Sequence, residues 1–172
     1  MPYTTGAYNL PFPIKRYLDT NGDGTGTKNA NGDYSVTPGR FYIQPPAGVI
    51  YLLDELLIHL VDTGAFAASD YGNIAGGLTN GVQLFAKRNG VTIFDLLDGV
   101  TIMNNGQFGH ISADMSFPNW ASSGGSITVG FKTSAYGLQF PLNGDTADSL
   151  EAILTDDLTG LLDHHFIVTG RI

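Results

Sequence analysis

The sequence predicts an all-β fold, an antiparallel β-sandwich or jelly roll of about eight strands with an extended N-terminal arm. Turn signals rich in glycine, asparagine, aspartate and proline recur about every ten residues, and no sustained helical period lies between them. The chain has 172 residues, 42% of them hydrophobic, so it can form one domain with a substantial core. We expect residues 1–40 to form the arm and residues 41–172 to form the body.

The arm is predicted from its prolines and from its widely spaced aromatic residues. Six of the eight prolines lie within the first 46 residues, where they exclude long helices. Such a segment has few ways to build a core of its own, so its aromatic side chains are expected to dock on the body or on a partner chain. The predicted partner-binding residues are Tyr3, Tyr8, Phe12, Lys15, Arg16 and Tyr17.

Residues 19–35 form a segment rich in glycine and asparagine, which we interpret as a long hairpin loop. Its first half also matches a calcium-binding loop, with Asp19, Asn21 and Asp23 at positions 1, 3 and 5. The twelfth position, where a glutamate would bind the ion through both oxygens, is Ala30. A structural turn is therefore the favoured interpretation, and the three residues are kept as a candidate calcium site.

The longest apolar run, residues 48–62, is predicted to be a buried strand around which the body packs. A run of this length also fits a helix, so its flanks and composition are used to choose between strand and helix. Two prolines precede it, Gly64 ends it, and it is rich in β-branched and aromatic residues, which together favour a strand. Two acidic residues and a histidine interrupt the run, and it is shorter than the roughly 18 residues that a membrane span needs. No membrane partner is expected.

The clearest hairpin signal is the pair Asn89-Gly90, which favours a tight turn with positive φ angles. Before it, Val82, Leu84 and Ala86 are expected on one face of a strand, and after it residues 91–95 are expected to alternate between two faces. Connections are predicted over residues 64–80, with at most one helical turn, and over 101–110, irregular or briefly helical. Further strands are predicted over residues 111–117, 126–133, 137–142, 148–154 and 161–172.

The histidines form no recognisable metal-binding or catalytic pattern. His164 and His165 are adjacent, so on a strand they point to opposite faces and cannot hold one ion together. His59 and His110 are isolated in the sequence. The chain has no cysteine, which excludes disulfides, thiolate metal sites and cysteine nucleophiles.

The carboxylates offer adjacent pairs that a glycosidase could use, Asp54 with Glu55 and Asp156 with Asp157. Neighbours in a strand diverge, however, and neighbours in a turn are usually solvated caps. Glu151 alternates with apolar residues as an outward strand residue would. From these residues we predict a β-sandwich with an arm that is not an enzyme.

The net charge of −8 is unevenly distributed, with +1 on residues 1–40 and −9 on the remainder. An acidic body repels phosphate backbones, so nucleic acid is not expected as a partner. The arm can still meet an acidic surface.

Three stretches together resemble the small decoration, or cement, proteins of tailed-phage capsids. They are residues 19–60, with the arm loop and FYIQPPAGVIYLLDELLIHL; residues 80–99, NGVQLFAKRNGVTIFDLLDG; and residues 149–172, SLEAILTDDLTGLLDHHFIVTGRI. The resemblance implies a jelly-roll body with an N-terminal extension and implies neither enzymatic activity nor a cofactor. It also implies synthesis in the host cytoplasm and a final place on the outer surface of the capsid.

The partners that the resemblance implies are the major capsid protein and further copies of the chain, as a homodimer or homotrimer. Two other classes stay open, a carbohydrate-binding module and a receptor-binding protein of a fibre tip. A carbohydrate-binding module would use an exposed aromatic platform, for which Phe117 and Trp120 are the candidates, although a buried tryptophan is as good an interpretation. Glycan binding would favour either of these classes, and saturable binding to undecorated heads would favour a cement protein.

Overall fold

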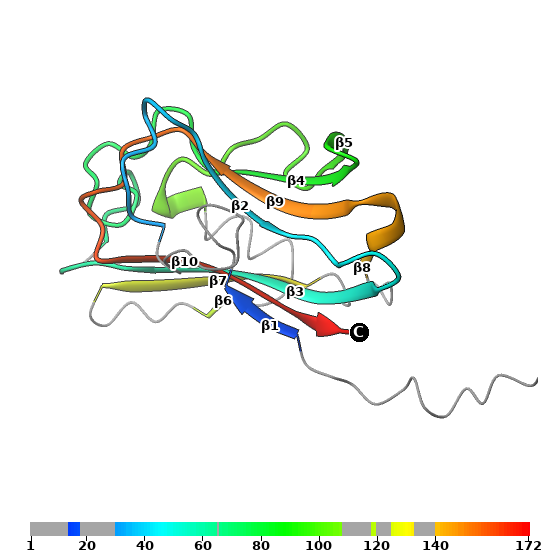
Figure 1. Cartoon of the computed structure of the whole chain (residues 1–172). Helices are drawn as coiled ribbons and strands as arrows, with labels where there is room; N and C mark the ends of the chain where they lie inside the picture. The colour runs from blue at the N-terminus through cyan, green and yellow to red at the C-terminus, as the bar shows by residue number, and fades with distance from the viewer. Residues whose placement is uncertain (1–13, 18–29, 65, 108–117, 120–124, 133–139) are drawn as a thin grey trace, which may run out of the picture.

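The computed structural model shows an antiparallel β-sandwich (Figure 1) and describes residues 14–17, 30–64, 66–107, 118–119, 125–132 and 140–172. Its strands are β1 (Ile14–Tyr17), β2 (Gly39–Ile43), β3 (Ile50–Val61), β4 (Gln83–Arg88), β5 (Val91–Asp95), β6 (Pro118–Asn119), β7 (Ser126–Lys132), β8 (Phe140–Asn143), β9 (Asp148–Leu154) and β10 (Asp163–Arg171). A short 3-10 turn, Gly144–Thr146, joins β8 to β9.

The strands form two sheets, and every pairing is antiparallel. One sheet has the order β1-β10-β3-β7-β6, with β8 beside the first part of β3, and the other has the order β2-β9-β4-β5. Leaving aside the short β6 and β8, the eight main strands pair in a nested way: β1 with β10, β2 with β9, β3 with β7, and β4 with β5. Because successive pairs lie in alternate sheets, this is the strand order of a jelly roll, and the predicted fold class is confirmed.

The predicted central strand is confirmed as β3, which lies in the middle of its sheet between β10 and the pair β7 and β8. Its buried residues alternate up to Leu53 and then resume at Leu56, a shift of one residue. The cause is a β-bulge: Thr169 of β10 lies opposite Glu55 and the next residue, Gly170, lies opposite Leu53, which leaves Asp54 as the extra residue. The bulge therefore keeps both halves of a long strand facing the core.

The core fills the space between the two sheets. Phe41 of β2 packs against Phe166 of β10, with ring centroids 5.4 Å apart, so this aromatic pair joins the two layers. The largest fully buried side chains are Tyr71, Phe41, Phe166, Leu53, Ile58, Leu60, Leu84, Ile102, Leu142 and Leu154.

The predicted hairpin is confirmed. Asn89 and Gly90 have φ angles of 47° and 78°, as a two-residue turn between β4 and β5 requires. Val82, Leu84 and Ala86 are buried, as expected of one face of the strand.

Several other predicted strands are also present. Residues 148–154 are strand β9 with the predicted bounds, and the strands expected over 126–133, 137–142 and 161–172 correspond to β7, β8 and β10. Residues 66–80 form turns with a bridge between Tyr71 and Ile74, and residues 105–107 form part of a helical turn. No helix in the described ranges is long and apolar enough to cross a membrane. The strand predicted over residues 111–117 lies outside the described residues.

Part of the predicted arm belongs to the sandwich. Strand β1 pairs with β10 at the edge of the larger sheet, and Gly39 and Arg40 are the first residues of β2. Ala30 is buried, and its N–H donates to the carbonyl oxygen of His164 at 2.6 Å. The boundary between arm and body after residue 40 stays a prediction, but the packed structure already includes these residues.

Candidate interaction surface

Half of the exposed large hydrophobic residues in the described ranges lie on or beside strand β5. This strand is one of the two edge strands of the smaller sheet (Figure 1). Val91, Ile93, Phe94 and Val100 are 67%, 53%, 56% and 54% exposed. They are four of the eight large hydrophobic residues found exposed among the described residues. We call these four residues the β5 patch. Because they lie close together in the chain, they form one candidate contact surface.

A second β-bulge explains why β5 does not alternate as predicted. Phe94 lies opposite Ala86 and Thr92 lies opposite Lys87, so Ile93 is an extra residue in the hairpin. Residues 91–94 are all exposed, whereas the sequence predicted alternation between two faces. Bulges at sheet edges redirect side chains, and here the consequence is that two adjacent apolar residues both reach solvent.

The turn that follows β5 is held by Asp95. Its carboxylate accepts hydrogen bonds from the backbone N–H groups of Leu97 and Gly99, both at 2.9 Å. The N–H of Leu96 donates to the carbonyl oxygen of Leu84 at 3.0 Å, which ties the turn to β4. The position of Val100 is also fixed, because its N–H donates a 3.0 Å hydrogen bond to the carbonyl oxygen of Leu97. These hydrogen bonds therefore fix the backbone that follows β5 and carries Val100 of the β5 patch.

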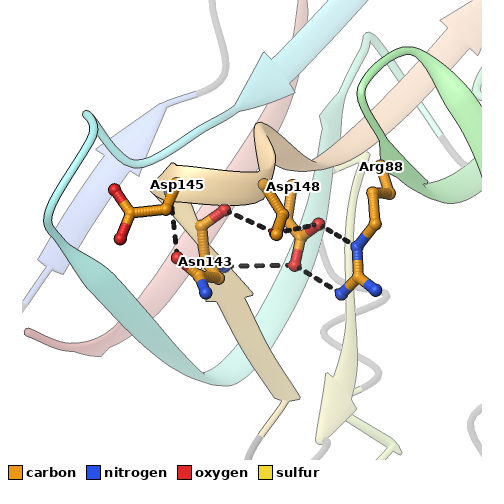
Figure 2. Close-up of polar contacts among 5 residues, drawn as sticks. Arg88, Asn143, Asp145 and Asp148 are labelled. Atoms are coloured by element: carbon orange, nitrogen blue, oxygen red, sulfur yellow. Dashed lines mark hydrogen bonds and ion pairs between the residues drawn. The ribbon is translucent and has the colours of Figure 1, made fainter.

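The other end of the hairpin is anchored by an ion pair between Arg88 and Asp148 (Figure 2). The guanidinium donates from Nε at 2.8 Å and from Nη2 at 3.1 Å to the two carboxylate oxygens. Asp148 also accepts hydrogen bonds from Thr146 Oγ1 at 2.9 Å and from the N–H of Asn143 at 3.2 Å. The Arg88 hydrogen bond is the main reason why the pKa of Asp148 is lowered to about 2. The turn beneath it is closed by Asn143 Oδ1, which accepts the N–H of Asp145.

Glu151 lies at the centre of the same sheet, and its predicted exposure is wrong. It does alternate with the core residues of β9, but its side chain is fully buried. Arg40 of β2 binds its carboxylate through two nitrogens, Lys87 Nζ of β4 lies 2.8 Å from Oε2, and Ser149 Oγ donates at 2.8 Å. Burial alone would raise the pKa of Glu151, but these hydrogen bonds outweigh it and hold the pKa at about 2. The carboxylate therefore ties three strands together.

Asp156 is also buried, at 8% exposure, although its place in a turn predicted a solvated cap. Its carboxylate accepts the backbone N–H groups of Thr79 at 2.9 Å, Asn80 at 3.1 Å and Gly81 at 2.8 Å. Asp157 instead caps its own turn by accepting the N–H of Thr159 at 3.0 Å. The two adjacent carboxylates thus stabilise two different loops.

The two adjacent histidines point to opposite faces, as predicted. His164 is fully buried, with Nε2 2.8 Å from the hydroxyl of Tyr71 and Nδ1 3.4 Å from the carbonyl oxygen of Ala30. Burial lowers the pKa of His164 to about 3 and raises that of Tyr71, so both are neutral at pH 7. His165 lies on the other face, where its ring stacks on that of His59 at 6.4 Å. Within the described ranges, no three histidine or acidic residues form a group that could hold a metal ion.

The unfolding free energy is expected to decrease as the pH is lowered from neutrality, in part because of His164. The pKa of His164 is about 3 in the folded chain, whereas an unperturbed histidine of the unfolded chain has a pKa of 6.5, so unfolding takes up a proton between those pH values. One proton corresponds to about 1.4 kcal/mol per pH unit. Urea unfolding between about pH 5 and 6 should give a shallower pH dependence in His164→Gln, and equal slopes would contradict this explanation.

The predicted partner-binding residues are only partly described by the structure. Lys15, Arg16 and Tyr17 lie in β1, opposite Thr169, Val168 and Ile167 of β10, so their backbones belong to the larger sheet, whereas β5 belongs to the smaller one. The following predicted residues lie outside the described ranges: Tyr3, Tyr8, Phe12, the calcium candidates Asp19, Asn21 and Asp23, and also His110, Phe117 and Trp120.

The β5 patch was not predicted from the sequence, although one signal was present. In the segment VTIF, apolar residues stand at both odd and even positions. A strand with one buried and one exposed face would instead alternate apolar and polar residues. Fold and surface together define a jelly-roll β-sandwich with an apolar patch at one sheet edge. Comparison with known protein families, curated proteins and solved structures finds no match for this chain.

Proposed function

We propose that this chain is a non-enzymatic structural protein of a virion that binds the outside of a phage head and cements neighbouring major capsid subunits. The observation that supports this proposal most directly is the β5 patch, an exposed apolar surface on a sandwich held by ion pairs whose carboxylates are buried. Exposed apolar patches on soluble domains commonly mark contacts with other macromolecules. The resemblance to capsid decoration proteins favours a capsid as that partner.

The roles of the buried carboxylates also agree with a structural protein. Glu151, Asp148 and Asp156 are each engaged by cationic side chains or backbone N–H groups of their own chain. Hydrogen bonds hold the pKa of Glu151 and of Asp148 at about 2, so both are ionised at neutral pH and neither is poised to transfer a proton there. Glu151 and Asp148 stabilise the sheet that carries the β5 patch, and Asp156 holds the loop that precedes β4.

A cement protein acts by mass action, because a ligand that binds only the expanded shell stabilises that shell. Because the same contacts repeat over the capsid lattice, contacts that are weak individually can together give stable attachment. The arm adds contact area in this proposal, and its net charge of +1 beside a body of −9 favours attachment of the arm to an acidic capsid surface.

Removing residues 1–13 is expected to weaken attachment to heads while leaving the body folded. The first described segment of the arm, β1, begins at Ile14 and pairs with β10, so this truncation removes no residue of the described sheet. Co-sedimentation with expanded, undecorated heads of the phage that encodes the chain measures attachment, and urea unfolding measures stability. The variant in which Tyr3, Tyr8 and Phe12 are all alanine keeps the arm length and should show the same loss of binding.

The outcome of this experiment separates the function classes. If the truncated protein decorates heads as tightly as the full chain, the arm is not the clamp. If the full chain does not bind heads but binds a glycan on a glycan array, the proposed cement function is wrong, and a receptor- or carbohydrate-binding function replaces it. Heads decorated by the full chain should also tolerate more heat than undecorated ones.

A further inference from the structure

We infer that the β5 patch is the contact between two copies of this chain, related by a two-fold axis that passes close to Ile93 and Phe94. The inference deepens the proposed function, on which it rests for the biological role of the dimer, by naming the surface used for self-association. A two-fold axis brings the same patch of both copies together, so the inferred assembly is a homodimer and not a homotrimer.

The position of the patch suits such a contact. β5 has β4 on one side and, among the described residues, no strand on the other. The bulge at Ile93 interrupts the regular hydrogen-bonding edge, which opposes simple addition of a further strand. The contact is therefore made by side chains, with Ile93 and Phe94 of one copy packing against the same residues of the other.

The charge around the patch favours a second copy in particular. Two bodies of net charge −9 repel each other, so they can associate only where the local charge is small. The charged groups of residues 85–100 and their ion-pair partners add up to only −1, with three basic residues against four acidic ones: Arg40, Lys87 and Arg88 against Asp95, Asp98, Asp148 and Glu151. Two of the four basic residues of the whole body, residues 41–172, thus lie beside the patch.

The same charges are self-complementary. Arg88 stands before the turn at one end of β5, and its side chain remains 54% exposed beside its ion pair with Asp148. Asp98 is exposed beyond the other end of β5. A two-fold axis across β5 reverses the direction of the partner strand, so the basic end of each copy faces the acidic end of the other.

A cysteine substitution gives a direct test, because the chain has no cysteine of its own. Ile93→Cys in the full-length protein is expected to form a disulfide-linked dimer under mild oxidation, since the two sulfurs lie near the axis. Val36→Cys is the matched control, because Val36 is 89% exposed and precedes β2, which lies at the opposite edge of the smaller sheet from β5. The control is expected to stay predominantly monomeric on a non-reducing gel.

A second measurement is sedimentation equilibrium of the purified chain in solution. Phe94→Asp is expected to raise the dimer dissociation constant on the order of tenfold or more, because two like charges would meet at the axis. Asp98→Lys should act in the same direction by facing Arg88 of the other copy. Val36→Asp should leave the constant unchanged, and thermal unfolding checks that each variant is folded.

Each result either supports or overturns the two-fold contact. A monomeric full-length protein, or a dimer that Phe94→Asp leaves intact and that Ile93→Cys does not crosslink, would overturn it. If the chain is monomeric but Phe94→Asp abolishes decoration of heads, the patch meets the capsid instead, and the proposed function stands without this inference. Dimers that crosslink through Ile93→Cys would support the inference even if the chain fails to bind heads.

Discussion

Replacing Ile58 by aspartate is expected to unfold the sandwich. Ile58 is 1% exposed in the middle of β3, between Phe166 of β10 and Val129 of β7. An ionised carboxylate placed there has no partner, and an unpaired buried charge costs several kcal/mol out of a total stability of about 5 to 15 kcal/mol. Circular dichroism and urea unfolding should show a chain that is unfolded, or close to it, at room temperature.

The control for this prediction lies on the same strand. Ile50 is the first residue of β3 and is 50% exposed, so Ile50→Asp introduces the same group where water can reach it. We expect a loss of stability below about 1 kcal/mol for this variant. If the two substitutions were equally tolerated, residues 48–62 would not form the buried centre of the fold.

Replacing Glu151 by glutamine is expected to destabilise the sandwich by about 3 to 5 kcal/mol. The substitution keeps the shape of the side chain but removes the only negative charge that Lys87 contacts in the described structure. The Lys87 side chain is 16% exposed, so its ammonium would be left largely buried without a counterion. Arg40 is half exposed and can turn toward water, so the cost comes mainly from Lys87.

Two further variants make the explanation testable. Asp54→Asn removes the charge from a more exposed ion pair, in which Arg171 Nη2 lies 3.5 Å from the carboxylate, and should cost less than about 1 kcal/mol. Adding Lys87→Met to Glu151→Gln should recover part of the loss, because the unpaired ammonium is then gone. If the double variant is no more stable than Glu151→Gln alone, buried charge is not the cause.

The contribution of Glu151 should also depend on pH in a defined direction. Its pKa is about 2 in the folded chain against an ordinary value of 4.5, so unfolding takes up a proton between those values. The stabilisation is present above about pH 4.5 and is lost as the pH decreases toward 2. His164 acts in the same direction but starts nearer neutrality, because the ordinary pKa of histidine is 6.5. The two contributions can therefore be separated along the pH axis.

Elements whose signals are local could be predicted from the order of residues alone. The apolar run of residues 48–62 became β3, Asn89-Gly90 became the turn of the β4–β5 hairpin, and residues 148–154 became β9. The opposite directions of His164 and His165 also follow from strand geometry alone. In each case the decisive information lies within a few neighbouring residues, because turn preferences and alternation depend on nearby backbone geometry.

Which polar and apolar side chains are covered depends instead on packing between distant segments. Glu151 alternates like an exposed residue, yet Arg40, 111 residues away in the chain, and Lys87 close over it from the neighbouring strands. The sequence predicts that Phe94 lies on one face of an alternating strand. A bulge in the pairing of β5 with β4 and the position of β5 at the sheet edge instead leave Phe94 exposed to solvent. Solvent exposure depends on the elements that pack around a residue, and their register is set by contacts between segments far apart in the sequence.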